Sequence, residues 1–159
     1  MSKGLVLMIH GLGGGASTWG SFPALLAADL HIADRFAIEP PYVYTTGLAG
    51  RGPGIADLAR ELATHLNRPE LADYSQIAIL AHSLGGLVAR RLVADMIIEG
   101  APPRISRIMT FASPLLGAGA ASVSKLIPGT GTQHRDLAIG SDFMIALGRD
   151  WANTGADSM

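Results

Sequence analysis

Ser83 lies in a segment typical of a reactive serine on a tight turn. The run Ala81-His82-Ser83-Leu84-Gly85-Gly86 stands between a continuously apolar stretch, residues 77–81, and a helical pattern. On such a strand-to-helix turn the serine hydroxyl is presented above the sheet, and the positions two before and two after it must be small. Gly85 meets this demand, and Ala81 exceeds glycine by one methyl group. Ser83 is therefore a candidate nucleophile for acyl transfer.

A glycine-rich segment after the first apolar run could supply the complementary chemistry. His10-Gly11-Leu12-Gly13-Gly14 follows the stretch 5–9 directly. Glycines let the backbone turn so that an N–H group points at a reacting carbonyl oxygen, where negative charge develops. We expect the two donors of this oxyanion hole to be the N–H groups of Leu12 and of Leu84, the residue after the serine. Losing one such donor costs on the order of 3 kcal/mol of transition-state stabilisation.

Apolar runs and helical patterns alternate along the chain, which indicates a parallel sheet covered by helices. We predict the α/β class, with a mostly parallel open sheet flanked by helices, in one domain over residues 1–159. The predicted strands are 5–9, 35–39, 77–81 and 105–112, and the predicted helices are 19–30, 53–66, 84–98 and 141–151. Pro53 is expected to be the first residue of its helix.

Ligand sites in such sheets lie at the carboxyl ends of the strands. The loops expected to surround the site are 10–18, 40–54, 82–86 and 113–135. Tyr42, Tyr44 and Leu48 could line it or belong to ordinary surface loops. Apolar loop residues would suit an acyl chain: Leu12, Leu48, Leu115 and Leu116.

Composition excludes several function classes. The formal net charge is -1 without a basic cluster, so nucleic acid is not an expected partner. The chain has no cysteine, which excludes disulfides and thiolate nucleophiles, and no histidine–carboxylate group has the spacing of metal ligands, so we expect no metal and no other cofactor. The apolar runs are too short to cross a bilayer, and the first residues lack a signal sequence, so we expect a cytoplasmic protein with no transmembrane segment.

Taken together, these motifs resemble the lipase-like serine esterases of the α/β-hydrolase superfamily, near the GPI inositol-deacylase-like and triacylglycerol lipase-like members. The resemblance is carried by HGLGG, by a tyrosine-containing segment before IADLARELATHL, by LAHSLGGLVARRL and by MTFASPLLGAG. HRDLAIGSDFMIAL also resembles a family stretch, so the likeness covers nearly the whole chain. It implies a serine hydrolase that acts on carboxylic esters or lipids through Ser83, without a cofactor.

The resemblance also implies that part of the catalytic machinery lies outside the chain. In this fold the order is serine, acid, histidine, and the one histidine after Ser83 is His134, in a predicted loop. Asp95 and Glu99 precede His134, but they lie on the predicted helix after the serine rather than at the end of a strand. We therefore expect the acid and the base beyond Met159, and a Ser83 that is correctly placed but largely unactivated. A substitute triad through His134 is the alternative.

The last predicted strand, 105–112, carries apolar residues on both faces and is followed by no further strand. It would then be an exposed sheet edge, which natural proteins avoid. We expect a sheet that is incomplete on its C-terminal side, or a homo-oligomer that pairs these edges. The remaining histidines have structural interpretations: His10 holds the glycine loop, His82 packs beside the serine, and His31 and His65 lie on the surface.

Two other classes of function compete with hydrolysis. Gly11-x-Gly13-x-x-Ala16 after a strand matches a dinucleotide-binding fingerprint, with Glu39 as a ribose partner. Against it, Pro40-Pro41 follows the acid and the segment around Ser83 stays unexplained. The second alternative is a hydrolase-like module that binds a ligand without catalysis, since a serine without its base is a poor nucleophile. Acyl transfer to an acceptor other than water would use the same residues.

Overall fold

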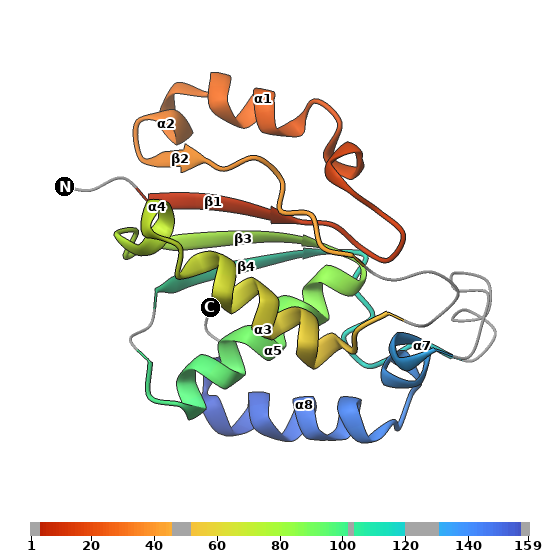
Figure 1. The fold of residues 1–159 in the computed structure, drawn as a ribbon. Coiled ribbons are helices and arrows are strands. Elements are labelled where there is room, and N and C mark those ends of the chain that lie inside the picture. Colours follow the sequence, from red (N-terminus) through yellow and green to blue (C-terminus); the bar gives the residue numbers. More distant parts are fainter. Residues whose placement is uncertain (1–3, 46–51, 102–103, 120–130, 157–159) are drawn as a thin grey trace.

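An open sheet of four parallel strands forms the centre of the molecule (Figure 1). The computed structural model describes residues 4–45, 52–101, 104–119 and 131–156. The strands are β1 (Gly4–Ile9), β2 (Phe36–Ile38), β3 (Ile77–His82) and β4 (Ile105–Phe111), in the order β2-β1-β3-β4. The predicted α/β class and the four predicted strands are thus confirmed, with ends that differ by at most one residue.

Strict alternation of side chains assigns the residues of the central strands to two cores. Leu5, Leu7 and Ile9 of β1 face one side of the sheet and are almost completely buried. Val6 and Met8 of the same strand face the other side and join a smaller cluster with Trp19. Because both faces are apolar, β1 can pair only in the interior of a sheet covered on both sides.

Helices α3 (Ile55–Leu66) and α5 (Leu84–Ile98) cover the larger core, and α8 (Asp142–Thr154) packs against α5 (Figure 1). The apolar stripe of α3 is buried as its spacing predicts, and Leu58 and Leu62 are inaccessible to solvent. Ser141 caps α8 by accepting a hydrogen bond from the Met144 N–H group. The predicted helix 84–98 matches α5 at both ends.

The other face is covered by shorter helices than the sequence predicts. In place of one helix over 19–30, a 3₁₀ turn, η1 (Ala16–Trp19), is followed by α1 (Phe22–Ala28) and α2 (Leu30–Ala33). The break between α1 and α2 has a local cause: the Asp29 side chain accepts hydrogen bonds from the N–H groups of His31 and Ile32 and so starts a new helix.

The start of one helix and the presence of two short helices also differ from prediction. Helix α3 begins at Ile55 rather than Pro53, because the Gly54 N–H donates to Asp57 and the Ile55 N–H donates to Asp136, far along the chain. Two short helices were not predicted: α4 (Pro69–Ala72), and α7 (Thr132–Leu137), which contains His134. His134 therefore lies on a helix, and the prediction of a loop at this position was wrong.

Strand β4 is the exposed edge that its sequence predicts. Met109 and Phe111 of β4 pair with Leu80 and His82 of β3 and are 45% and 41% exposed. They lie on the face of the sheet that α1 and α2 cover, but these helices pack against β2, at the other edge, and leave β4 open. In the described part of the chain no strand pairs with the outer side of β4. Whether a second copy of the chain does so stays a prediction.

Candidate active site

Ser83 stands at the turn between β3 and α5 in a backbone conformation that side chains rarely adopt. Its φ is 51° and its ψ is -121°. The turn is fixed on both sides, since the Ser83 N–H donates to the Phe111 carbonyl at 2.8 Å and the Gly86 N–H donates to the Ser83 carbonyl at 3.1 Å. Strain of this kind costs on the order of 1–3 kcal/mol per residue and persists where surrounding structure imposes it.

Three glycines allow the chain segments around Ser83 to approach closely. A Cβ atom on Gly85 would lie 2.7 Å from the His10 carbonyl oxygen, and one on Gly11 would lie 2.7 Å from Ser83 Cβ. A Cβ atom on Gly86 would lie 2.6 Å from Ser113 Cβ, in the segment after β4. Gly85 is therefore required by a backbone contact with the end of β1, and Gly11 and Gly86 by close contacts with the Ser83 and Ser113 side chains.

Leu12 occupies a tight turn that leaves its N–H group unused. The Gly14 N–H donates to the Gly11 carbonyl at 3.1 Å, and Gly13 has a φ of 64°. In such a turn the internal hydrogen bond uses the fourth residue's N–H, so that of the second residue, Leu12, can point outward. Leu84 is the first residue of α5, where N–H groups have no partner within the helix.

Two buried residues, His10 after β1 and Tyr44 after β2, contact this turn. His10 Nδ1 lies 2.6 Å from the Gly11 carbonyl oxygen, and the Tyr44 N–H donates to Nε2 at 3.2 Å. Since Nε2 accepts, Nδ1 must carry the hydrogen and donate to Gly11. The Tyr44 hydroxyl donates to the His10 carbonyl at 2.6 Å, and the two rings stack 4.2 Å apart. Burial raises the pKa of Tyr44, and the neighbouring Tyr42 raises it further, so the hydroxyl stays a donor.

A pocket of about 430 Å³ opens beside Ser83. It brings together the three residues singled out in the sequence, Ser83, Leu12 and Leu84. Its other lining residues are His82, Ala112, Pro114, Gly117, Ala118, Gly119 and Leu137. Most of the lining side chains are apolar, with His82 and Ser83 as the polar ones. Leu137 was not predicted to line the site, because helix α7 was not predicted.

Other residues expected to line the site lie elsewhere. Tyr44 is buried beside the turn. The Tyr42 ring lies 4.5 Å from the His65 ring, tilted by 40°, and His65, which was predicted to lie on the surface, is partly buried. Leu116 is 87% exposed and Leu115 packs against the core, so neither borders the pocket. Leu48 lies outside the described residues.

In the described part of the chain, no side chain is hydrogen-bonded to the Ser83 hydroxyl. His82 borders the pocket, but its Nδ1 is buried against Gly11 and has no hydrogen-bond partner. Within the described ranges, no hydrogen bond joins the Ser83 hydroxyl to His134 or to a carboxylate. Asp95, one of the acids that precede His134, is instead paired with Arg91 on α5. His134 itself does not line the pocket at Ser83, although Leu137 of the same helix does.

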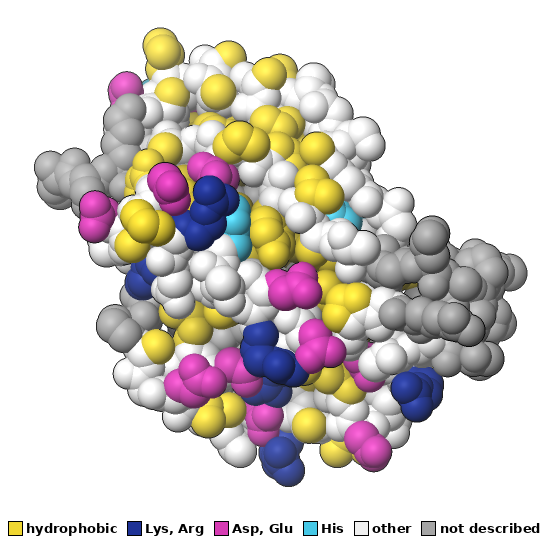
Figure 2. All heavy atoms as spheres, viewed as in Figure 1, with side chains coloured by type: hydrophobic (Ala, Val, Ile, Leu, Met, Phe, Trp, Pro, Cys, Tyr) yellow, Lys and Arg dark blue, Asp and Glu magenta, His cyan; other side chains and the backbone are white. Residues whose placement is uncertain are grey.

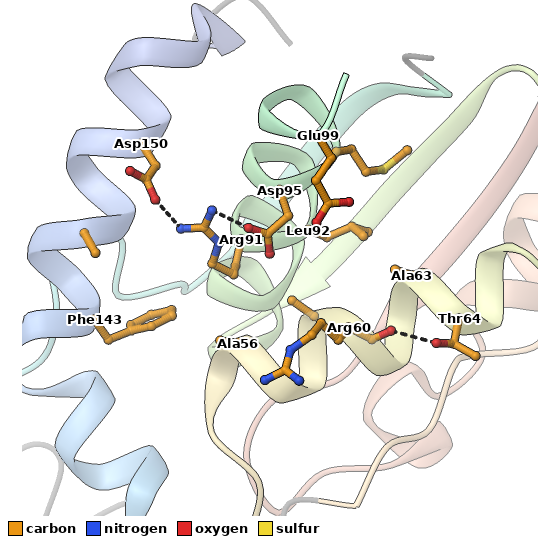
Figure 3. Close-up of a pocket in the computed structure, with 13 residues that line it drawn as sticks. Ala56, Arg60, Ala63, Thr64, Arg91, Leu92, Asp95, Glu99, Phe143 and Asp150 are labelled. Carbon is orange, nitrogen blue, oxygen red and sulfur yellow. Dashed lines mark hydrogen bonds and ion pairs between the residues drawn. The ribbon is translucent and has the colours of Figure 1, made fainter. Parts of the chain in front are cut away.

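A larger cavity, of about 700 Å³, lies between α3, α5 and α8 (Figure 3). The Arg91 side chain points from α5 to Asp95 at 2.5 Å and to Asp150 of α8 at 2.7 Å. The Thr64 hydroxyl donates to the Arg60 carbonyl in the same view. The Arg91–Asp150 pair joins α5 to α8, and none of these hydrogen bonds activates a nucleophile, so the cavity carries no catalytic assignment.

The Arg91–Asp150 contact leads to a pH prediction. The hydrogen bond from Arg91 holds the pKa of Asp150 below its ordinary value. A lowered folded-state pKa contributes stability above the unfolded value of about 4, and this is lost as the pH falls through the folded value. We expect Asp150→Asn to lower the unfolding free energy at pH 7 by about 1 kcal/mol, or about 2–4 °C in Tm.

Thermal melts of both proteins from pH 7 down to pH 3 measure this effect, with Asp34→Asn, at an exposed position after α2, as the control. The difference in Tm should shrink at the acid end for Asp150→Asn alone. A difference that stays constant over this range contradicts the assignment.

The face of the molecule drawn in Figure 2 carries side chains of both charges. Figure 2 shows acidic and basic side chains side by side in the lower part of this face, where α3, α5 and α8 lie. In the described ranges no group of three or more histidines and carboxylates is arranged to hold a metal ion. Nor does any described helix have the length and apolar character needed to span a bilayer.

The geometry of the glycine loop disfavours dinucleotide binding. That function needs an α-helix directly after the loop, whose N-terminus holds the pyrophosphate. Here Gly13 and Gly14 are followed by the single 3₁₀ turn of η1, and α1 begins only at Phe22. The sequence pattern of the dinucleotide-binding fingerprint is therefore present, but the loop is not followed by the helix that this function requires.

An open parallel sheet with a serine on the turn between a strand and a buried helix defines a class of hydrolase-like α/β proteins. The model of the Alpha/beta hydrolase family matches residues 6–157, and the chain belongs to this family. No curated protein matches the chain.

Solved structures share the fold at low sequence identity. Phospholipase PlaB from Legionella pneumophila, in complex with thio-NAD, has a TM-score of 0.73 and 20% identity over 92% of this chain and 33% of that chain. Bacillus licheniformis lipase BlEst2 in mature form has a TM-score of 0.65 and 18% identity over 95% and 60%. A carboxylesterase structure from Nitrososphaera gargenis has a TM-score of 0.58 and 19% identity over 77% and 42%. The chain thus spans a third of the phospholipase and 60% of the lipase.

Proposed function

We propose that the chain provides the nucleophile and the oxyanion hole of a serine hydrolase that acts on carboxylic esters or lipids. Ser83 is the nucleophile, and the N–H groups of Leu12 and Leu84 receive the negative charge. The observation that carries the proposal is the strained turn at Ser83, whose φ is 51°, beside Leu12 and Leu84 in one apolar pocket. Strained residues are concentrated at functional sites, and on this turn the strain raises the Ser83 hydroxyl above the sheet, where it can reach a ligand.

The chemistry is a two-step acyl transfer. Ser83 Oγ adds to the ester carbonyl carbon and loses its proton to a base, and the carbonyl oxygen takes up the charge between the two N–H groups. Collapse of this intermediate expels the alcohol and leaves an acyl-serine, which water then hydrolyses. The described residues offer the donors but no base in contact with Ser83, so the nucleophile is slow in this chain unless a base joins it.

The pocket supports an uncharged ester with an apolar acyl group. Its lining side chains are mainly apolar, and Leu12, Pro114 and Leu137 are among them. A charged group would lose its hydration there without a partner. The proteins of similar fold include a phospholipase, a lipase and a carboxylesterase, which supports an acyl ester as the substrate class.

The proposal is tested with an alkyl fluorophosphonate, which reacts with a serine that has oxyanion donors. We expect wild-type protein to form one adduct, slowly and at Ser83, as read by intact mass and peptide mapping. Ser83→Ala should form no adduct at this site. Ser113→Ala, which removes a hydroxyl buried nearby, is the matched control and should react at the wild-type rate.

Each result separates the competing interpretations. No adduct with Ser83 at any time favours the binding module without catalysis. An adduct that survives Ser83→Ala overturns the choice of nucleophile. Fast reaction that His134→Ala abolishes would mean that the chain completes its own triad through His134.

A further inference from the structure

We infer that Tyr44 is a positioning residue for the oxyanion hole and that it acts through His10 on the turn that carries Leu12. This inference rests on the proposed function, because it gives the turn its purpose. Tyr44 follows β2, whereas His10 and Leu12 follow β1, so the contact joins two loops at the carboxyl edge of the sheet. Neither Tyr44 nor His10 borders the pocket, so an effect of Tyr44 on the reaction must pass through the turn that carries Leu12.

Tyr44 holds His10 at three points. Its hydroxyl donates to the His10 carbonyl, its N–H donates to Nε2, and its ring stacks on the imidazole with an interplanar angle of 18°. His10 is completely buried and Tyr44 is 5% exposed, so water cannot replace these contacts. The contact between the Tyr44 N–H and Nε2 fixes the tautomer, and with it the donor at Nδ1.

That donor reaches the turn itself. Nδ1 donates to the Gly11 carbonyl, the same oxygen that accepts the Gly14 N–H and closes the turn around Leu12 and Gly13. The His10 carbonyl, held by the Tyr44 hydroxyl, is also the atom against which Gly85 packs. Tyr44 thus fixes the turn relative to the first residues of α5, where Leu84 lies. The two N–H groups of the oxyanion hole come from these two segments, and their spacing depends on this contact.

The test uses Tyr44→Phe, which removes the hydroxyl and keeps the ring and backbone contacts with His10. We expect hydrogen exchange at the Gly14 amide to rise about tenfold, the size of effect expected for one buried hydrogen bond. Phosphonylation of Ser83 should slow by a similar factor, and the downfield NMR shift of the Leu12 amide in the adduct should be smaller. Exchange at the Ile79 amide in β3 should stay unchanged, which shows that the fold is intact.

Tyr42→Phe is the matched control, because it removes a hydroxyl two residues away, on a ring that packs against His65. It should leave the Gly14 exchange rate and the Leu12 shift at their wild-type values. Gly14 exchange that does not respond to Tyr44→Phe, or responds equally to Tyr42→Phe, overturns the inference. Absence of any wild-type adduct at Ser83, with the exchange response present, overturns the proposed function instead.

Discussion

Replacing Gly85 by alanine is expected to destabilise the protein by about 2 kcal/mol, although alanine is the better helix former. Gly85 is in the first turn of α5, where a Cβ atom would meet the His10 carbonyl oxygen at 2.7 Å and the Ile9 carbonyl oxygen at 3.0 Å. Both contacts are with backbone at the end of β1, which is paired on both sides and cannot shift alone. Strand and helix would therefore have to separate, and Leu84 would move away from Leu12.

The matched control is Gly148→Ala in α8, where a Cβ atom meets nothing within 4 Å. This variant should gain about 0.5–1 kcal/mol from helix propensity and a less flexible unfolded chain. Denaturant unfolding measures the difference in unfolding free energy between the two variants. In a thermal melt, the Tm of Gly85→Ala should fall by about 4–8 °C. A Gly85→Ala protein as stable as wild type would mean that the close approach of β1 and α5 is not required.

The strands and the long helices could be predicted because their residues follow a simple periodicity. The stretches that became β1 and β3 are apolar at every position, as strands covered on both faces must be, and α3 repeats its buried residues at helical spacing. Side-chain hydrogen bonds, one local and one long-range, set the boundaries that periodicity did not predict. Asp29 divides a predicted helix by capping its second half, and Asp136, far along the chain, decides where α3 begins. A contact of the latter kind leaves no periodic signal in the sequence.

The candidate site shows the same division. Ser83, Leu12 and Leu84 could be located because their glycine neighbours mark the turns that bring them together. The position of Tyr44 could not be predicted, because a tyrosine between prolines and glycines in the sequence can equally face a ligand or pack beneath a loop. Its contacts with His10 arise from the pairing of β1 with β2, which sets the two following loops side by side. Leu137 was missed for a related reason: six residues of helix after a glycine-rich stretch are too few for a periodic pattern.

Replacing Ser83 by glycine is expected to remove all reaction with the fluorophosphonate and at the same time to raise stability. The φ of 51° and ψ of -121° at Ser83 strain a residue with a Cβ atom and suit glycine. Relief of strain worth about 1–3 kcal/mol is partly offset by about 0.5–1 kcal/mol from the more flexible unfolded chain. The net gain should be about 1 kcal/mol, or about 2–4 °C in Tm.

Ser83→Ala separates the two effects, because it removes the hydroxyl but keeps the Cβ atom and its strain. It should lose the adduct as completely as Ser83→Gly, with no comparable rise in Tm. Ala112→Gly, at a φ of 50° in the same pocket, should gain stability while Ser83 still reacts. Equal melting temperatures for Ser83→Gly and Ser83→Ala would mean that the turn is not strained. A higher Tm for Ser83→Gly than for Ser83→Ala would mean that holding a side chain at this position lowers the stability of the protein. Such a loss of stability is expected where the side chain is needed for function.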